Sequence, residues 1–168
     1  LSNGEKIPQL SEFLDILAGE GNTKLIIEIK THSDEARGKA CVAAVVDMVK
    51  SRGLQAKVEY IAFSINLCKE VVRLDPNAHV AYLNGDLGPA TLKALGIMGL
   101  DYTAGIYRSN PAWPNVARAN GMTTNVWTIN DMPTMAEMTN CGINFITTDN
   151  PVDALKVEQI YNLQKAGE

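Results

Sequence analysis

The segment KLIIEIKTHSDEARGKACVAAVVDMVKSRG, residues 24–53, decides the fold class. It begins with a short β-branched run, residues 24–30, which predicts a strand. An amphipathic stretch follows at residues 34–52, and Gly53 stands where helices commonly end in a left-handed residue. The segment is therefore one βα unit, and repeated units of this kind form a parallel sheet.

The same alternation continues to the end of the chain. Further strands are predicted at residues 58–63, 79–83, 100–104, 123–129 and 144–148, and helices at 67–74, 89–95, 114–120, 132–139 and 152–164. A helix over residues 10–17, with Ser11 as a candidate N-cap, precedes the first strand. No strand leads into a GxGxxG or GxxxxGK[ST] turn, which favours a (β/α)8 barrel over an open, nucleotide-binding sheet.

A complete barrel needs eight units, whereas this chain supplies six and begins within a helix. We therefore expect an α/β fold, a TIM (β/α)8 barrel with its first two strands absent from this chain. Residues 1–168 are expected to form a single, N-terminally incomplete domain. An incomplete barrel has two exposed sheet edges, so self-association through these edges is also expected.

Composition argues against two classes of partner. The 15 Lys and Arg are outnumbered by 19 Asp and Glu, for a net charge of -4, and they are scattered along the chain. We expect no nucleic-acid partner, because such proteins carry a clustered basic surface. The apolar runs are far shorter than the roughly 18 residues that cross a bilayer, so no transmembrane span is expected.

Two charges interrupt the first strand, Glu28 and Lys30. They are two residues apart and share one face, while Ile27 and Ile29 face the helices. Burying charge in a parallel strand is costly unless the charge is paired or used. At the mouth of a barrel, a carboxylate suits a hard divalent cation and an ammonium suits a phosphate. The alternative is an internal ion pair that fills the barrel end.

Other polar and aromatic residues follow later strands. Asn125 and Trp127 share a face, so Trp127 is either a pocket wall or a core residue. Asp149 predicts a cap of the last helix, with phosphate binding at that helix end as the alternative. His32 lies in the loop after the first strand and faces either the mouth or the surface. His79 begins a strand, which favours a structural role.

In this order, the segments resemble the glycerophosphodiester phosphodiesterase family. The match runs through IPxLxExL at residues 7–14, IEIK at 27–30, VWTIN at 126–130 and CGINFITTDNP at 141–151. The combination covers nearly the whole chain and is far more specific than any single piece.

The resemblance implies a PLC-like phosphodiesterase barrel that hydrolyses glycerophosphodiesters, its small-molecule substrates in glycerol and lipid metabolism, to glycerol 3-phosphate and an alcohol. Its implied cofactor is a divalent metal, Ca or Mg. Glu28 corresponds to a metal ligand, Lys30 to a phosphate contact and Trp127 to a pocket wall. Further candidates at the same mouth are Asn130, Asp149 and His32.

The chain also departs from the family pattern. The HRG and HD segments with the two catalytic histidines, and the nearby acidic ligands, precede the region that this chain covers. We therefore expect the catalytic residues upstream and this chain alone to be inactive. Residues 60–64, YIAFS, differ from the family's strand end, which speaks against a substrate role for Ser64. Two alternatives remain: a degenerate, non-catalytic barrel that binds a ligand or serves as a surface module, and another phosphodiesterase of the phosphatidylinositol phospholipase C type.

Overall fold

The computed structural model describes residues 2–166 of the chain, and within them six strands form one sheet. The strands are β1 (Leu25–Glu28), β2 (Val58–Ala62), β3 (His79–Tyr82), β4 (Gly99–Thr103), β5 (Thr123–Trp127) and β6 (Phe145–Ile146). All neighbours are parallel, and the spatial order follows the chain. An order without reversal is that of a barrel wall, whereas doubly wound sheets reverse at a switch point. The sheet is thus a half-barrel, and the predicted βα alternation is confirmed.

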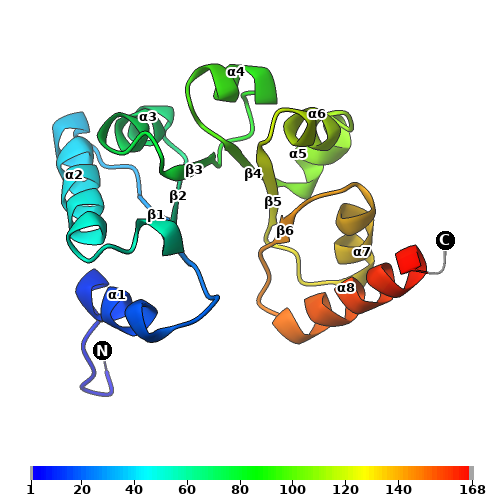
Figure 1. Ribbon diagram of the computed structural model, residues 1–168, viewed down its shortest axis with the longest axis horizontal. Coiled ribbons are helices and arrows are strands. Elements are labelled where there is room, and N and C mark those ends of the chain that lie inside the picture. Colours follow the sequence, from blue (N-terminus) through cyan, green and yellow to red (C-terminus); the bar gives the residue numbers. More distant parts are fainter. Residues whose placement is uncertain (1, 167–168) are drawn as a thin grey trace.

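The helices lie along the outer side of this half-barrel (Figure 1). Their bounds are α1 (Leu10–Gly19), α2 (Glu35–Ser51), α3 (Ile65–Leu74), α4 (Pro89–Ala94), α5 (Ala104–Ser109), α6 (Trp113–Ala119), α7 (Met132–Asn140) and α8 (Pro151–Ala166), with a 3-10 turn η1 (Gln55–Lys57). Figure 1 shows strands on the inner side of the arc and an opening between α1 and α8.

Each strand presents alternate residues to two different environments. The helix-facing residues Tyr60, Leu100 and Tyr102 are at most 3% exposed and belong to one apolar core. The opposite, inner set is called the concave face below. Its strand residues are Ile26, Glu28, Glu59, Ile61, His79, Ala81, Gly99, Asp101, Thr103, Thr123, Asn125, Trp127 and Phe145.

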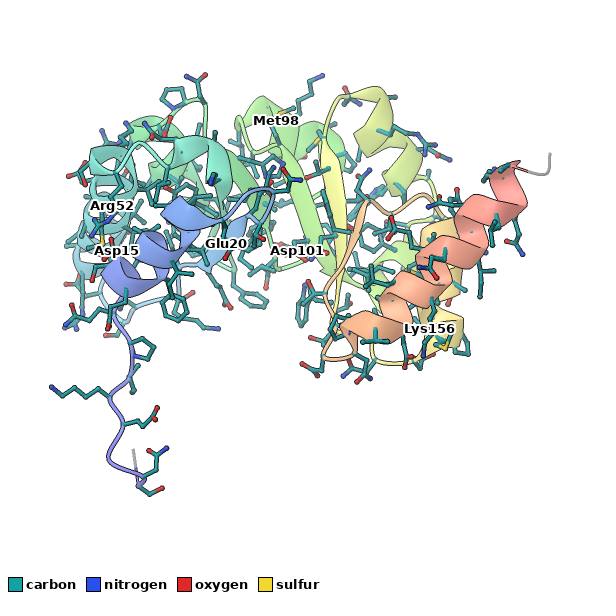
Figure 2. The ribbon with its side chains drawn as sticks, turned by 60° about the horizontal axis from the view of Figure 1, so that its bottom comes forward. Asp15, Glu20, Arg52, Met98, Asp101 and Lys156 are labelled. Carbon is teal, nitrogen blue, oxygen red and sulfur yellow. The ribbon has the colours of Figure 1, made fainter. Side chains whose placement is uncertain are left out.

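The N-cap of the first helix, α1, differs from the prediction. Gln9 precedes α1, and its backbone N donates to Glu12 Oε2 at 2.7 Å, so the expectation of Ser11 as N-cap is wrong. A Glu three residues into a helix reaches back to satisfy a free N–H at its start. Arg52 Nε donates to Asp15 Oδ1 at 3.3 Å and joins the end of α2 to α1 (Figure 2).

Two short elements and several strand boundaries differ from the sequence-based expectation; β1 and β5, for example, each end two residues before their predicted ends. Both η1 and α5 are additional, and β6 is two residues long where residues 144–148 are predicted. Helix α5 forms because Tyr107, 2% exposed, anchors it: its hydroxyl donates to the carbonyls of Leu100 and Asn125, at 2.9 and 3.0 Å. None of the described helices has the length and apolar character needed to span a bilayer.

Candidate active site

Glu28 and Lys30 lie side by side at the carboxyl end of β1. Lys30 Nζ is 2.7 Å from Glu28 Oε1, and Ile29 between them is buried on the helix side. The prediction that the two charges share the inner face is confirmed. The Lys30 side chain is 75% exposed, so its ammonium is available to a ligand at the mouth.

Asp101 is a second acidic residue on the concave face, and the sequence reasoning missed it. It is 3% exposed and accepts a hydrogen bond at Oδ1 from Asn125 Nδ2, at 2.5 Å. Burial raises the pKa of Asp101 to about 6; the Asn125 hydrogen bond opposes this rise, and the charge of Glu28 adds to it. Figure 2 shows Asp101 in the space inside the arc. The signal was available, since a charge inside a predicted strand is the same feature that singled out Glu28.

Trp127 closes the mouth of the concave face together with Phe63. Its ring meets the Phe63 ring edge to face, with centroids 5.7 Å apart and planes at 86°. Trp127 Nε1 donates to the backbone O of Asp101 at 2.9 Å. The indole therefore has its polar atom satisfied and packs against a second aromatic ring on the concave face. Phe63, which the sequence reasoning did not single out, is 40% exposed beside it.

Asn130 and Asp149 connect the loops after β5 and β6. Asn130 Nδ2 donates to Asp149 Oδ2 at 2.8 Å, and Asp149 N donates to Asn130 Oδ1 at 2.8 Å. The prediction that Asp149 caps α8 is wrong: α8 begins at Pro151, so Asn150 precedes it directly, and the described contact of the Asp149 carboxylate is with Asn130. Asn130 and Asp149 thus join the loops after β5 and β6 by two hydrogen bonds.

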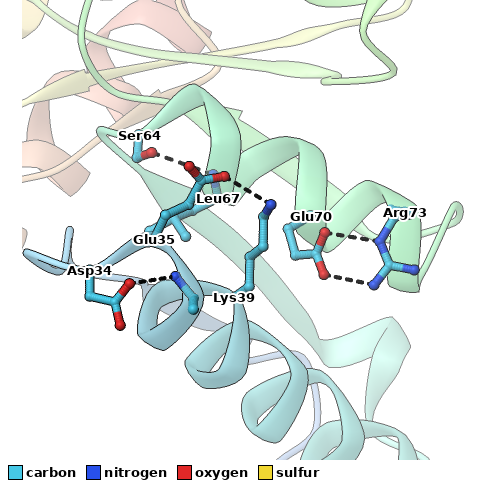
Figure 3. Close-up of polar contacts among 8 residues, drawn as sticks. Asp34, Glu35, Lys39, Ser64, Leu67, Glu70 and Arg73 are labelled. Atoms are coloured by element: carbon cyan, nitrogen blue, oxygen red, sulfur yellow. Dashed lines mark hydrogen bonds and ion pairs between the residues drawn. The ribbon is translucent and has the colours of Figure 1, made fainter.

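His32 lines a cavity of about 210 Å³ between the loops after β1 and β2. Ser64 lines it too, and this residue caps α3, because its hydroxyl accepts from Leu67 N at 3.4 Å (Figure 3). Asp34 caps α2 by accepting from Ala36 N at 3.0 Å. The described polar contacts of His32 do not include the Glu28 and Lys30 pair.

The floor of the concave face is a polar network around His79. Its Nε2 is 2.9 Å from Thr123 Oγ1, and its Nδ1 is 3.3 Å from Glu59 Oε2. Lys24 Nζ donates to Glu59 Oε1 at 2.6 Å. The predicted structural role of His79 is thereby confirmed. The His79 hydrogen bond above all, with further help from Lys24 and against the effect of burial, lowers the pKa of Glu59 to about 2.

This network depends on a glycine in β4. A Cβ on Gly99 would lie 2.5 Å from Ala81 Cβ and 3.2 Å from His79 Cε1. His79 of β3 reaches Thr123 of β5 across the strand between them, because Gly99 has no side chain.

The described residues supply one candidate metal ligand. No group of three or more His, Cys, Asp or Glu side chains in residues 2–166 is arranged to hold a metal ion. Glu28 Oε1 is shielded from solvent, and among residues 2–166 its polar partner is the Lys30 ammonium. A shielded carboxylate oxygen of this kind fits one position in the ligand set of a hard cation.

Comparison with known proteins identifies the family. The glycerophosphoryl diester phosphodiesterase family matches residues 2–153. The chain belongs to this family. The expected family, and with it the class of phosphoric diester hydrolases, is confirmed. None of the curated proteins compared matches the chain.

Solved structures of this family share the fold. A glycerophosphodiester phosphodiesterase from Parabacteroides distasonis is 41% identical with a TM-score of 0.92, and the match covers 96% of this chain and 68% of that one. A putative glycerophosphoryl diester phosphodiesterase from Silicibacter pomeroyi is 23% identical with a TM-score of 0.79, covering 89% and 55%. An Oleispira antarctica phosphodiesterase, in complex with the product sn-glycerol-3-phosphate, is 18% identical with a TM-score of 0.64, covering 77% and 53%. The last two show likeness of fold alone.

Proposed function

We propose that the protein containing this chain hydrolyses glycerophosphodiesters to glycerol 3-phosphate and an alcohol, with a divalent cation, Ca or Mg. The observation that carries this proposal is the Glu28 and Lys30 pair at the carboxyl end of β1, on the concave face of a family member. The Oleispira antarctica relative binds sn-glycerol-3-phosphate, which supports a substrate of the same small-molecule class.

Each residue of the pair has a distinct proposed role. Lys30 binds a phosphate oxygen through its exposed ammonium and offsets the charge that gathers there in the transition state. Glu28 is one ligand of the cation, which supplies Lewis-acid stabilisation of the phosphoryl group. Trp127 and Phe63 wall the bound glycerol moiety and limit access of water.

Acid/base catalysis is assigned to residues outside this chain. Its sequence contains two histidines, His32 and His79, and His79 is engaged by Glu59 and Thr123 on the floor. Phosphodiester cleavage needs an acid for the leaving alcohol, and each such group contributes about 10² to 10⁴ in rate. We propose that the 168-residue chain by itself binds substrate without turning it over.

The complete fold is proposed to be a TIM barrel in which two upstream strands lie between β6 and β1. Strands β1 and β6 are the two edge strands of the described sheet. Exposed apolar side chains gather near the two edges: Ile26, Phe13 and Ile16 on one side, Phe145, Leu155 and Ile160 on the other. The match to the Parabacteroides distasonis enzyme covers 68% of that chain, which leaves room for the missing part.

The test is release of glycerol 3-phosphate from glycerophosphocholine and glycerophosphoethanolamine. The full-length protein is expected to release it with Ca or Mg present and to lose activity with a chelator, while the 168-residue chain stays inactive. If the full-length protein binds glycerol 3-phosphate but does not release it from either diester, the hydrolase proposal is wrong. The non-catalytic, ligand-binding alternative then holds.

A further inference from the structure

A hydrogen-bonded chain on the concave face below Trp127 joins β4, β5 and the residue that follows β6. Asn125 on β5 is paired in register with Asp101 on β4. Its Nδ2 donates to Asp101 Oδ1 at 2.5 Å and to Thr147 Oγ1 at 2.9 Å. One amide group is thus held from both sides.

These two contacts fix the orientation of the Asn125 amide. An ionised carboxylate only accepts hydrogen bonds, so the nitrogen must face Asp101 and the oxygen must face away from it. Both amide hydrogens are used, and Oδ1 accepts from none of the residues that the structure describes. Asn125 Oδ1 is also accessible to solvent. Asn125 Oδ1 is therefore an acceptor of fixed orientation without a partner among residues 2–166.

Asp101 also binds Trp127. The backbone O of Asp101 accepts from Trp127 Nε1 at 2.9 Å, while its carboxylate holds Asn125. The strand registers place Asp101 on the same concave face as Glu28. Asn125 precedes Trp127 by two residues on β5 and faces the same side, so its acceptor lies directly below the indole on the concave face.

We propose that Asn125 Oδ1 accepts a hydrogen bond from a hydroxyl of the glycerol moiety, and that Asp101 is the positioning residue that holds this acceptor. The proposal deepens the proposed function and rests on it, because Lys30 anchors the phosphate. A ligand without the hydroxyl leaves the acceptor desolvated and unpaired, which is how a polar site rejects an analogue. Asn125 therefore selects glycerol phosphates over simple alkyl phosphates.

The experiment is calorimetric titration of the full-length protein, with Ca or Mg present, against sn-glycerol 3-phosphate and ethyl phosphate. The unsubstituted protein is expected to prefer glycerol 3-phosphate by roughly tenfold, the size of one hydrogen bond. Asn125→Ala should lower the affinity for glycerol 3-phosphate to the level of that for ethyl phosphate. The affinity for ethyl phosphate itself should not change. Asn162→Ala, exposed on α8, is the matched control and should keep the preference.

Two variants of Asp101 separate positioning from general damage. Asp101→Asn keeps an acceptor for the Asn125 amide and should keep most of the preference. Asp101→Ala leaves the Asn125 amide free to rotate. This variant should lose the preference for glycerol 3-phosphate and still bind ethyl phosphate. A structural defect would weaken both ligands together.

The possible results distinguish this inference from the function on which it rests. Lys30→Ala should weaken both ligands, because both carry a phosphate. An Asn125→Ala protein that keeps the tenfold preference overturns the role of Asn125 and leaves the phosphodiesterase proposal standing. An unsubstituted protein that binds neither ligand overturns both.

Discussion

Trp127 and Phe63 are 64 positions apart in the chain and meet edge to face across the mouth of the half-barrel, with ring centroids 5.7 Å apart. One follows β2 and the other ends β5, so the contact spans two intervening strands. An aromatic pair in this geometry stabilises by about 0.5–1.5 kcal/mol beyond its buried area.

A double-mutant cycle tests this pair. Phe63→Ala and Trp127→Ala are each expected to lower the free energy of unfolding, and the double variant should lose less than the two losses added, by about 1 kcal/mol. Urea unfolding of all four proteins measures the coupling. Strictly additive losses would show that the rings do not interact in solution.

The same substitutions should change substrate binding more than the chemical step. Both rings are proposed to contact the glycerol moiety equally in the ground and transition states, so KM should rise several-fold with a smaller change in kcat. Steady-state kinetics of the full-length protein gives the two constants separately. A fall in kcat alone, at constant KM, would show that the two rings do not contact the bound glycerol moiety.

Gly99 should not tolerate a side chain. Gly99→Ala places a Cβ 2.5 Å from Ala81 Cβ, and the required shift of β3 or β4 is expected to cost about 1–3 kcal/mol of stability. Gly21→Ala is the control, because a Cβ there meets no atom within 4 Å. Thermal unfolding that leaves the two variants equally stable would contradict the close approach of β3 and β4.

Glu59 makes the stability of the floor depend on acid. The pKa of Glu59 is about 2 in the fold against an ordinary value of 4.5, so its contribution is present above pH 4.5 and is lost as the pH falls toward 2. Glu59→Gln should flatten this part of the stability profile. Chemical unfolding at a series of pH values between about 5 and 2 measures it, and an unchanged slope in the variant would assign the acid sensitivity to other groups.

The strand pattern predicted the part of the site that lies along one strand. Glu28 and Lys30 are two residues apart, and the two-residue period of a strand is enough to place them on one face. Their polarity in a buried strand also indicated a reason for their presence. Element order and most boundaries followed from the same local rules.

Contacts between distant segments could not be read in this way. The pairing of Phe63 with Trp127 depends on the curvature of the sheet, and no local pattern encodes it. Asp149 was assigned to its own helix because local capping is the common case, whereas Asn130 from the previous loop binds it. Asp101 carried a readable signal in its strand, but its partners lie on other strands.

The most direct test of the central claim is the rate of glycerol 3-phosphate release by the full-length protein with one charge of the pair removed at a time. Glu28→Gln and Lys30→Ala are each expected to lower kcat/KM by about 10² or more, since each removes stabilisation of transition-state charge. Glu35→Gln and Lys39→Ala remove the same charges from an exposed pair on α2, 2.8 Å apart, and should retain full activity (Figure 3). Variants of Glu28 and Lys30 that hydrolyse the diester as fast as these controls would contradict the assignment of the active site.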